Sequence, residues 1–168
     1  MKRAAVAGLV VSMALAGAAA AKVTPAWTSV PPAVRAQLAA KTGTLYLPAR
    51  TPLFYRYRSG AGISGDILTL RFTNRVRIRE GVWRWTSKSF VWQVRPFAKT
   101  AACTNWARVQ KTFQMAGNKV YVSYGTAWRC VTDRKGRAHV LVATQGGALP
   151  DAALAMVVAS GLDVAGRS

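Results

Sequence analysis

The chain has 168 residues, with 24 lysines and arginines against 5 aspartates and glutamates, and a formal net charge of +19. A small soluble domain usually carries a net charge of magnitude about 2 to 8, so this excess favours attraction to polyanions, unless it serves only solvation. The length suits one domain with a hydrophobic core and excludes two ordinary ones, and one histidine with two cysteines excludes a metal centre built from those residues.

The first 21 residues have the organisation of a secretory signal peptide. Lys2 and Arg3 precede the apolar run Val6 to Leu15, which is too short to cross a bilayer, and Ala19 to Ala21 supply a small-residue cleavage site. No cysteine lies near the cleavage point, and no later apolar run reaches about 18 residues, so neither a lipid anchor nor a transmembrane segment is predicted. We expect a secreted or periplasmic protein whose mature part, residues 22–168, is a single domain.

Two helices flank a series of strands in the predicted order of elements. A proline pair starts a helix over residues 33–41, and Pro150 suits the first turn of a second helix over residues 149–160. Between them, segments of period two separated by turns predict strands. These cover residues 44–47, 53–58, 67–79, 82–95, 119–124, 128–132 and 139–144. The order predicts an α+β fold, with an antiparallel sheet of about six or seven strands and both helices packed on one face.

The strands over residues 67–79 and 82–95 form a predicted hairpin whose register follows from its turn. Apolar side chains alternate with arginines along the first strand, so one face is expected to be buried and the other basic. Glu80 and Gly81 have the spacing of a two-residue turn, which fixes the residues that lie opposite each other. The expected pairs are Val76 with Trp85 and Ile78 with Trp83 on the buried face, and Arg77 with Arg84 and Arg75 with Thr86 on the basic face.

The basic face of this hairpin is the main candidate for binding. The apolar positions change parity between Trp85 and Phe90, so we expect a bulge at residues 87–89, which returns Arg95 to the basic side. Like charges directly opposite each other destabilise a sheet, so an anionic partner explains the facing arginines unless solvent screens them. The predicted anion-binding residues are Arg71, Arg75, Arg77, Arg79, Arg84 and Arg95.

The motifs that would indicate catalysis are weak in this sequence. Gly60 to Gly65 matches G-x-G-x-x-G, but a strand follows it where a dinucleotide site needs a helix, so a hairpin loop and no cofactor are expected. His139 is the single histidine, and a Ser-His-Asp arrangement with Asp133 stays open although nothing singles out a serine. No metal-ligand cluster or carboxylate pair emerges, so the sequence indicates a non-enzymatic protein.

Cys103 and Cys130 are the two cysteines of the chain. In an exported protein such a pair predicts a disulfide, and a loop of this length is stabilised by about 3 to 4 kcal/mol on the chain-entropy estimate. Cys103 precedes Trp106 and Cys130 follows Trp128, so we expect the bridge to pack beside an indole.

The last part of the chain, residues 103–168, resembles small exported bacterial domains of unknown function. The residues that carry the resemblance are Lys111-Thr-Phe-Gln-Met-Ala-Gly-Asn-Lys-Val-Tyr-Val, Ala127-Trp-Arg-Cys-Val, and Leu149-Pro-Asp-Ala-Ala-Leu-Ala-Met-Val-Val-Ala-Ser. Through them the chain is distantly similar to half-barrel carriers of lipoproteins or lipids in the bacterial envelope. The resemblance implies a curved antiparallel sheet that embraces a helix, and it transfers no catalytic residues.

Three hypotheses about function follow. The first is a secreted or periplasmic binding protein whose basic face contacts an anionic polymer or surface, such as nucleic acid, cell-wall polymer or acidic lipid headgroups. The alternative is a carrier of an apolar or lipid ligand, held between sheet and helix in a pocket lined by Phe72, Trp85 and Trp92. The third is a hydrolase that uses His139, which would need a polar cleft around that residue.

Overall fold

A computed structural model describes residues 24–98, 100–145 and 149–165. The signal peptide expected over residues 1–21 lies outside these ranges. The helices are the 3-10 helix η1 (Ala26–Ser29) and the α-helices α1 (Pro32–Thr42), α2 (Thr100–Cys103) and α3 (Asp151–Ala159). The strands are β1 (Tyr46–Pro48), β2 (Tyr55–Ser64), β3 (Ile67–Arg79), β4 (Val82–Phe97), β5 (Lys111–Met115), β6 (Asn118–Ser123), β7 (Thr126–Thr132), β8 (Ala138–Gln145) and β9 (Gly161–Asp163).

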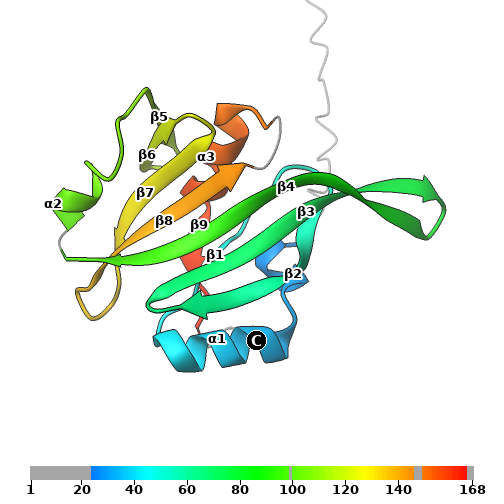
Figure 1. Ribbon diagram of the computed structural model, residues 1–168, viewed down its shortest axis with the longest axis horizontal. Coiled ribbons are helices and arrows are strands. Elements are labelled where there is room, and N and C mark those ends of the chain that lie inside the picture. Colours follow the sequence, from blue (N-terminus) through cyan, green and yellow to red (C-terminus); the bar gives the residue numbers. More distant parts are fainter. Residues whose placement is uncertain (1–23, 99, 146–148, 166–168) are drawn as a thin grey trace, which may run out of the picture.

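The fold is α+β, as the sequence predicts. Seven strands form an antiparallel sheet in the order β2-β3-β4-β8-β7-β6-β5, and β1 pairs with β9 in a separate two-stranded sheet. Figure 1 shows the long sheet curving across the molecule, with α1 beside its β2 edge and α3 behind β7 and β8. The expected helices are present within two residues at each end, whereas β5, β9 and α2 were not predicted.

One loop prediction is wrong. The segment Gly60 to Gly65 was expected to be a loop, but β2 continues through it to Ser64. The pairing of β2 with β3 shifts register between Ser59 and Gly62, and Gly60 lies there with a φ of 81°. A glycine tolerates that conformation without strain, so here it marks a bulge inside a strand.

The main core lies on one face of the seven-stranded sheet. Alternate residues of β3 and β4 belong to it, together with buried residues of α1 and α3. Phe72 and Phe90 stack with ring centroids 5.1 Å apart, and the indole Nε1–H of Trp92 donates to the backbone oxygen of Tyr46 at 2.9 Å. Burial of each such side chain contributes about 1.5 to 3 kcal/mol. These contacts fix the half of the hairpin that belongs to the body of the protein.

The opposite face of the sheet is covered around β7 and β8 by the segment that contains α2. Cys103 and Cys130 form the predicted disulfide there, with their Cα atoms 5.9 Å apart. Trp128 and Trp106 pack in the same small cluster, their rings edge to face with centroids 5.4 Å apart. The prediction that the bridge lies beside an indole is confirmed.

Arg129 connects the sheet to the end of α3. Its guanidinium donates to the carbonyl oxygens of Val158 and Gly161 and to Oδ1 of Asn118. The last carbonyls of a helix have no partner within the helix, so this side chain supplies one and places positive charge at the negative helix end.

Within the described ranges, no helix is long and apolar enough to cross a membrane.

Candidate functional site

The β3–β4 hairpin is longer than the sheet that supports it. β4 pairs with β8 only over residues 90–97, and β3 pairs with β2 only up to Asn74. The remaining part, residues 75–86, projects from the body as a twisted two-stranded ribbon, which we call the arm (Figure 1). Its residues therefore have neighbours within the hairpin and on few other elements.

The register of the arm differs from the prediction by one residue. Arg79 lies opposite Val82, as a two-residue turn at Glu80 and Gly81 requires, but a register shift between Arg77 and Arg79 displaces every later pair. The observed pairs are Arg77 with Trp83, Val76 with Arg84, and Arg75 with Trp85. The predicted pairs Val76 with Trp85, Ile78 with Trp83, Arg77 with Arg84 and Arg75 with Thr86 are wrong.

This register mixes aromatic and basic side chains on one face of the arm. Residues opposite each other in an antiparallel pair share a face, so Arg75 and Arg77 lie on the side of Trp83 and Trp85, while Arg84 lies on the other side with Val76. The Arg75 guanidinium carbon is 4.4 Å from the ring centroid of Trp83, and that of Arg58 in β2 is 5.6 Å from the ring of Trp85. Guanidinium groups and indoles therefore lie next to each other on this face.

The six arginines predicted to bind anions do not form one cluster. Arg71 lies in the body opposite Val91. Arg95 is half-buried in β4, where its Nη2 donates to Oε1 of Gln93 at 2.8 Å and its guanidinium lies 5.6 Å from the ring of Trp106. Arg75, Arg77, Arg79 and Arg84 are the members that the arm holds together.

The expected bulge is present at the junction between the arm and the body. The β3–β4 pairing shifts register between Thr73 and Arg75, where Asn74 faces a longer stretch of β4 that includes Ser87. The Thr86 hydroxyl lies within hydrogen-bond distance of both oxygens of Asn74 and accepts the backbone N–H of Lys88 at 3.2 Å. The bulge separates a covered half of the hairpin from an uncovered half.

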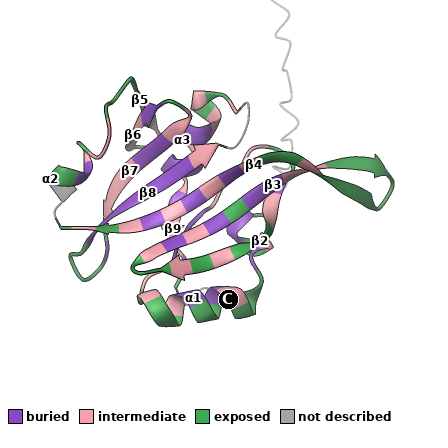
Figure 2. Cartoon of the chain, in the orientation of Figure 1, coloured by how far each residue is buried: buried purple, intermediate pink, exposed green. Residues whose placement is uncertain are grey.

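The tryptophans of the arm are not in the core, contrary to the prediction. Trp83 and Trp85 are each 37% exposed, and Ile78 is 58% exposed. Figure 2 shows the arm in the colours of exposed and intermediate residues, in contrast to the buried stripes of the body. The alternating pattern placed the two indoles on a common face correctly, but that face remains partly exposed.

The charge of the arm is strongly positive. Between residues 75 and 86 the chain has four arginines and one carboxylate, that of Glu80. Oε1 of Glu80 is 3.9 Å from Nη2 of Arg77, with 98% and 56% of the two side chains exposed. Such an exposed pair contributes little, so the arginines keep most of their capacity to bind an external anion.

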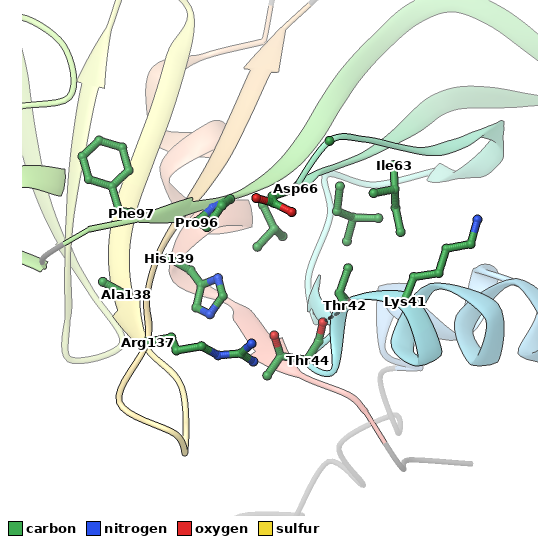
Figure 3. Close-up of a pocket in the computed structure, with 13 residues that line it drawn as sticks. Lys41, Thr42, Thr44, Ile63, Asp66, Pro96, Phe97, Arg137, Ala138 and His139 are labelled. Carbon is green, nitrogen blue, oxygen red and sulfur yellow. Dashed lines mark hydrogen bonds between the residues drawn. The ribbon is translucent and has the colours of Figure 1, made fainter.

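A pocket of about 420 Å³ with a mixed polar and apolar lining lies at the other end of the sheet, around His139. Figure 3 shows Arg137 and His139 facing Thr44 across this space, with Asp66 and Lys41 at its margins. The hydrolase hypothesis needs a polar cleft at His139, and this pocket provides one only in part, because Leu68, Val94 and Phe97 also line it.

Asp133 makes several hydrogen bonds at the edge of this pocket, and one of its contacts is His139. Asp133 is buried, and it accepts the backbone N–H groups of Lys135 and Arg137, both at 2.9 Å, and Nε of Arg137 at 2.7 Å. Burial opposes ionisation, but these bonds and His139 outweigh it and hold the pKa of this carboxyl well below its usual range. The carboxylate can only accept, so Nε2 of His139, 3.2 Å away, donates to it.

Thr42 and Thr44 supply the side-chain hydroxyl groups of the pocket, and among the described residues neither hydroxyl is hydrogen-bonded to His139. The Thr42 hydroxyl is within hydrogen-bond distance of the carbonyl oxygens of Leu38 and Thr44, which hold it at the end of α1. Asp133 is mainly the anchor of the turn between β7 and β8. Asp133 and His139 are adjacent, as they would be in a catalytic triad, but the contacts of Asp133 are those of a residue that stabilises a turn.

The candidate apolar pocket is not assembled either. Phe72 and Trp92 are completely buried in the main core. Trp85 lies on the arm, outside that core. The structure therefore brings two of these residues together as packing and separates the third.

Sequence reasoning missed Leu53 and Phe54, which lie at the base of the arm. The backbone oxygen of Phe54 accepts the N–H of Arg75 at 3.1 Å, and its ring centroid is 5.5 Å from that of Trp83. One signal for the arm was available, because strands are usually about 3 to 10 residues long and both strands of this hairpin exceed that length.

No protein-family model matches the chain, and no match was found among the curated proteins or the solved structures. Function is therefore inferred from the residues of the chain itself.

Proposed function

We propose that this protein binds an anionic polymer or surface through the arm, outside the cytoplasm and without catalysing a reaction. The observation that carries the proposal is the concentration of four arginines on a ribbon that projects from the body, with two half-exposed indoles between them. The disulfide between Cys103 and Cys130 is compatible with an oxidising compartment.

The chemistry of arginine supports a polyanion as the partner. A guanidinium presents five N–H donors in a planar fork, which matches the oxygens of phosphate, sulfate and carboxylate groups. The projecting ribbon presents guanidinium groups on both of its faces, because Arg75 and Arg84 lie on opposite ones. A polymer or surface with regularly spaced anions can thus contact several arginines at once, and the binding weakens with salt as counterions are released.

The experiment compares two variants with the same loss of charge. The first carries Arg75→Gln, Arg77→Gln and Arg84→Gln on the arm. The second carries Arg50→Gln, Arg108→Gln and Arg134→Gln, which are exposed residues of the body. Affinity for fluorescent heparin and for single-stranded DNA is measured by anisotropy at low and moderate salt.

We expect the arm variant to lose about tenfold to a hundredfold in affinity at low salt and to show a shallower salt dependence. The body variant should lose much less, because its arginines do not share a site. Equal losses in the two variants would contradict the proposal, since net charge alone would then explain the binding.

A further inference from the structure

Among the described residues, the arm and its base carry most of the large apolar side chains that are exposed, as well as a cluster of charge. Of the nine large apolar residues that are exposed among those described, seven lie on the arm or at its base. They are Leu53 (77%), Phe54 (41%), Val76 (36%), Ile78 (58%), Val82 (37%), Trp83 (37%) and Trp85 (37%). Scattered apolar residues on a surface need no explanation, but such a concentration marks an interaction site.

The aliphatic residues of this set indicate which kind of anionic partner the arm binds, a dissolved polymer or a surface with an apolar layer. Arginine and tryptophan can bind a dissolved polymer through ion pairs and stacking. Ile78 and Val82, close to the tip of the arm, gain nothing from a hydrated polyanion, because it offers no apolar environment. A second copy of the chain is disfavoured, since two arms would bring their arginines together.

We propose that the arm docks on an anionic lipid bilayer, with Ile78, Val82 and Trp83 in the boundary between headgroups and acyl chains. The arginines of the arm then contact lipid phosphates. This inference rests on the proposed function and names its surface. A bilayer supplies both chemistries that the arm presents, phosphate oxygens for guanidinium groups and an apolar layer beneath them.

The dimensions of the arm fit this role. The five residues from Arg75 to Arg79 span about 15 Å of strand, and the boundary that interfacial side chains occupy is about 5 to 10 Å deep. The arm projects beyond the body, so its tip can enter the boundary before the body meets the headgroups (Figure 1). Indoles prefer this depth because the ring is apolar and its N–H still finds a partner.

Glu80 at the tip limits how far the arm can enter. Its side chain is 98% exposed, and an anionic surface repels it. Arg77 and Arg79 flank the same turn, so the local charge stays positive. We therefore expect shallow, salt-sensitive docking at the interface.

The test uses protein without residues 1–21, because an apolar leader would itself bind lipid. Binding is measured by sedimentation with vesicles of phosphatidylcholine alone and with equal parts of phosphatidylglycerol and phosphatidylcholine, and by the blue shift of tryptophan emission. We expect at least about tenfold tighter binding to the anionic vesicles, and a Trp83→Phe variant should lose much of the shift.

The decisive variant is Ile78→Ser with Val82→Ser, which retains every arginine. It should bind anionic vesicles about tenfold more weakly and bind heparin as the parent does. The matched control, Val109→Ser with Tyr124→Ser, removes exposed apolar residues away from the arm and should bind both as the parent does. Circular dichroism and thermal unfolding show that each variant is folded.

Two other outcomes separate the two proposals. Unchanged vesicle binding of the Ile78→Ser, Val82→Ser variant would overturn the lipid inference, while heparin binding through the arm arginines would keep the proposed function. If the variant with Arg75→Gln, Arg77→Gln and Arg84→Gln bound heparin and vesicles as the parent does, both proposals would be overturned.

Discussion

The two halves of the β3–β4 hairpin have the same alternating pattern and different environments. In the body half, Phe72, Phe90 and Trp92 are completely buried beneath other elements. In the arm half, Trp83 and Trp85 share a face in the same way but remain 37% exposed. Alternation along a strand thus determines which side chains share a face, and only the rest of the chain determines whether that face is covered.

The largest expected difference between the halves is in stability. Phe72→Ala should lower the free energy of unfolding by about 3 to 5 kcal/mol, because it leaves a cavity in a packed core. Val82→Ser on the arm should change it by no more than about 0.5 kcal/mol. Denaturant titration measures both free energies of unfolding. A loss above about 2 kcal/mol for Val82→Ser would show that the arm packs against the body in solution.

The disulfide provides a second way to separate the halves. Cys103→Ser together with Cys130→Ser opens a loop with a sequence separation of 27 residues, so we expect a loss of about 3 to 4 kcal/mol. The bridge lies on β7, away from the arm, so heparin affinity should stay within about twofold at temperatures where the variant is folded. A large loss of affinity in the folded variant would mean that the arm depends on the body for its shape.

Acid should weaken the body while leaving the arm charged, and this is the smallest of the three effects. The pKa of Asp133 is lowered in the folded protein, so its stabilisation is complete above the unfolded value of about 3.9 and is lost as the pH falls below it. Asp133→Asn should flatten the dependence of the unfolding free energy on pH between about 5 and 2. An equally steep dependence in that variant would assign the acid sensitivity to another carboxyl.

The hairpin also shows what could be predicted from sequence. The turn at Glu80 and Gly81 follows from residue type, and its pairing of Arg79 with Val82 is correct. The register shift beyond the turn lies at Ile78, and isoleucine is not a residue typical of a bulge. The pairing of Arg77 with Trp83 could therefore not be predicted from the sequence. The second bulge was predictable because the apolar parity changes on either side of Ser87.

The rest of the fold divides in the same way. The helices, the main strands and the disulfide follow from local signals such as Pro150 and the cysteine pair. β5 was missed because its alternation is short: only Phe113 and Met115 face the main core, next to exposed Thr112 and Gln114. The arginines of the arm were predicted as a binding site, but the exposure of Trp83 was not, because it depends on where the neighbouring strands β2 and β8 end.

The pairing of β1 with β9 has a consequence for the order in which the chain can fold. Tyr46 lies opposite Asp163, the backbone N–H of Leu45 donates to Oδ1 of Asp163 at 3.1 Å, and that of Val164 donates to the oxygen of Leu45 at 2.8 Å. A segment made early in translation therefore waits for one made more than a hundred residues later, and contacts of such separation form slowly. The hairpin of β3 and β4 is local and can form first, so a nascent chain would display the arm before the core beneath β1 is closed.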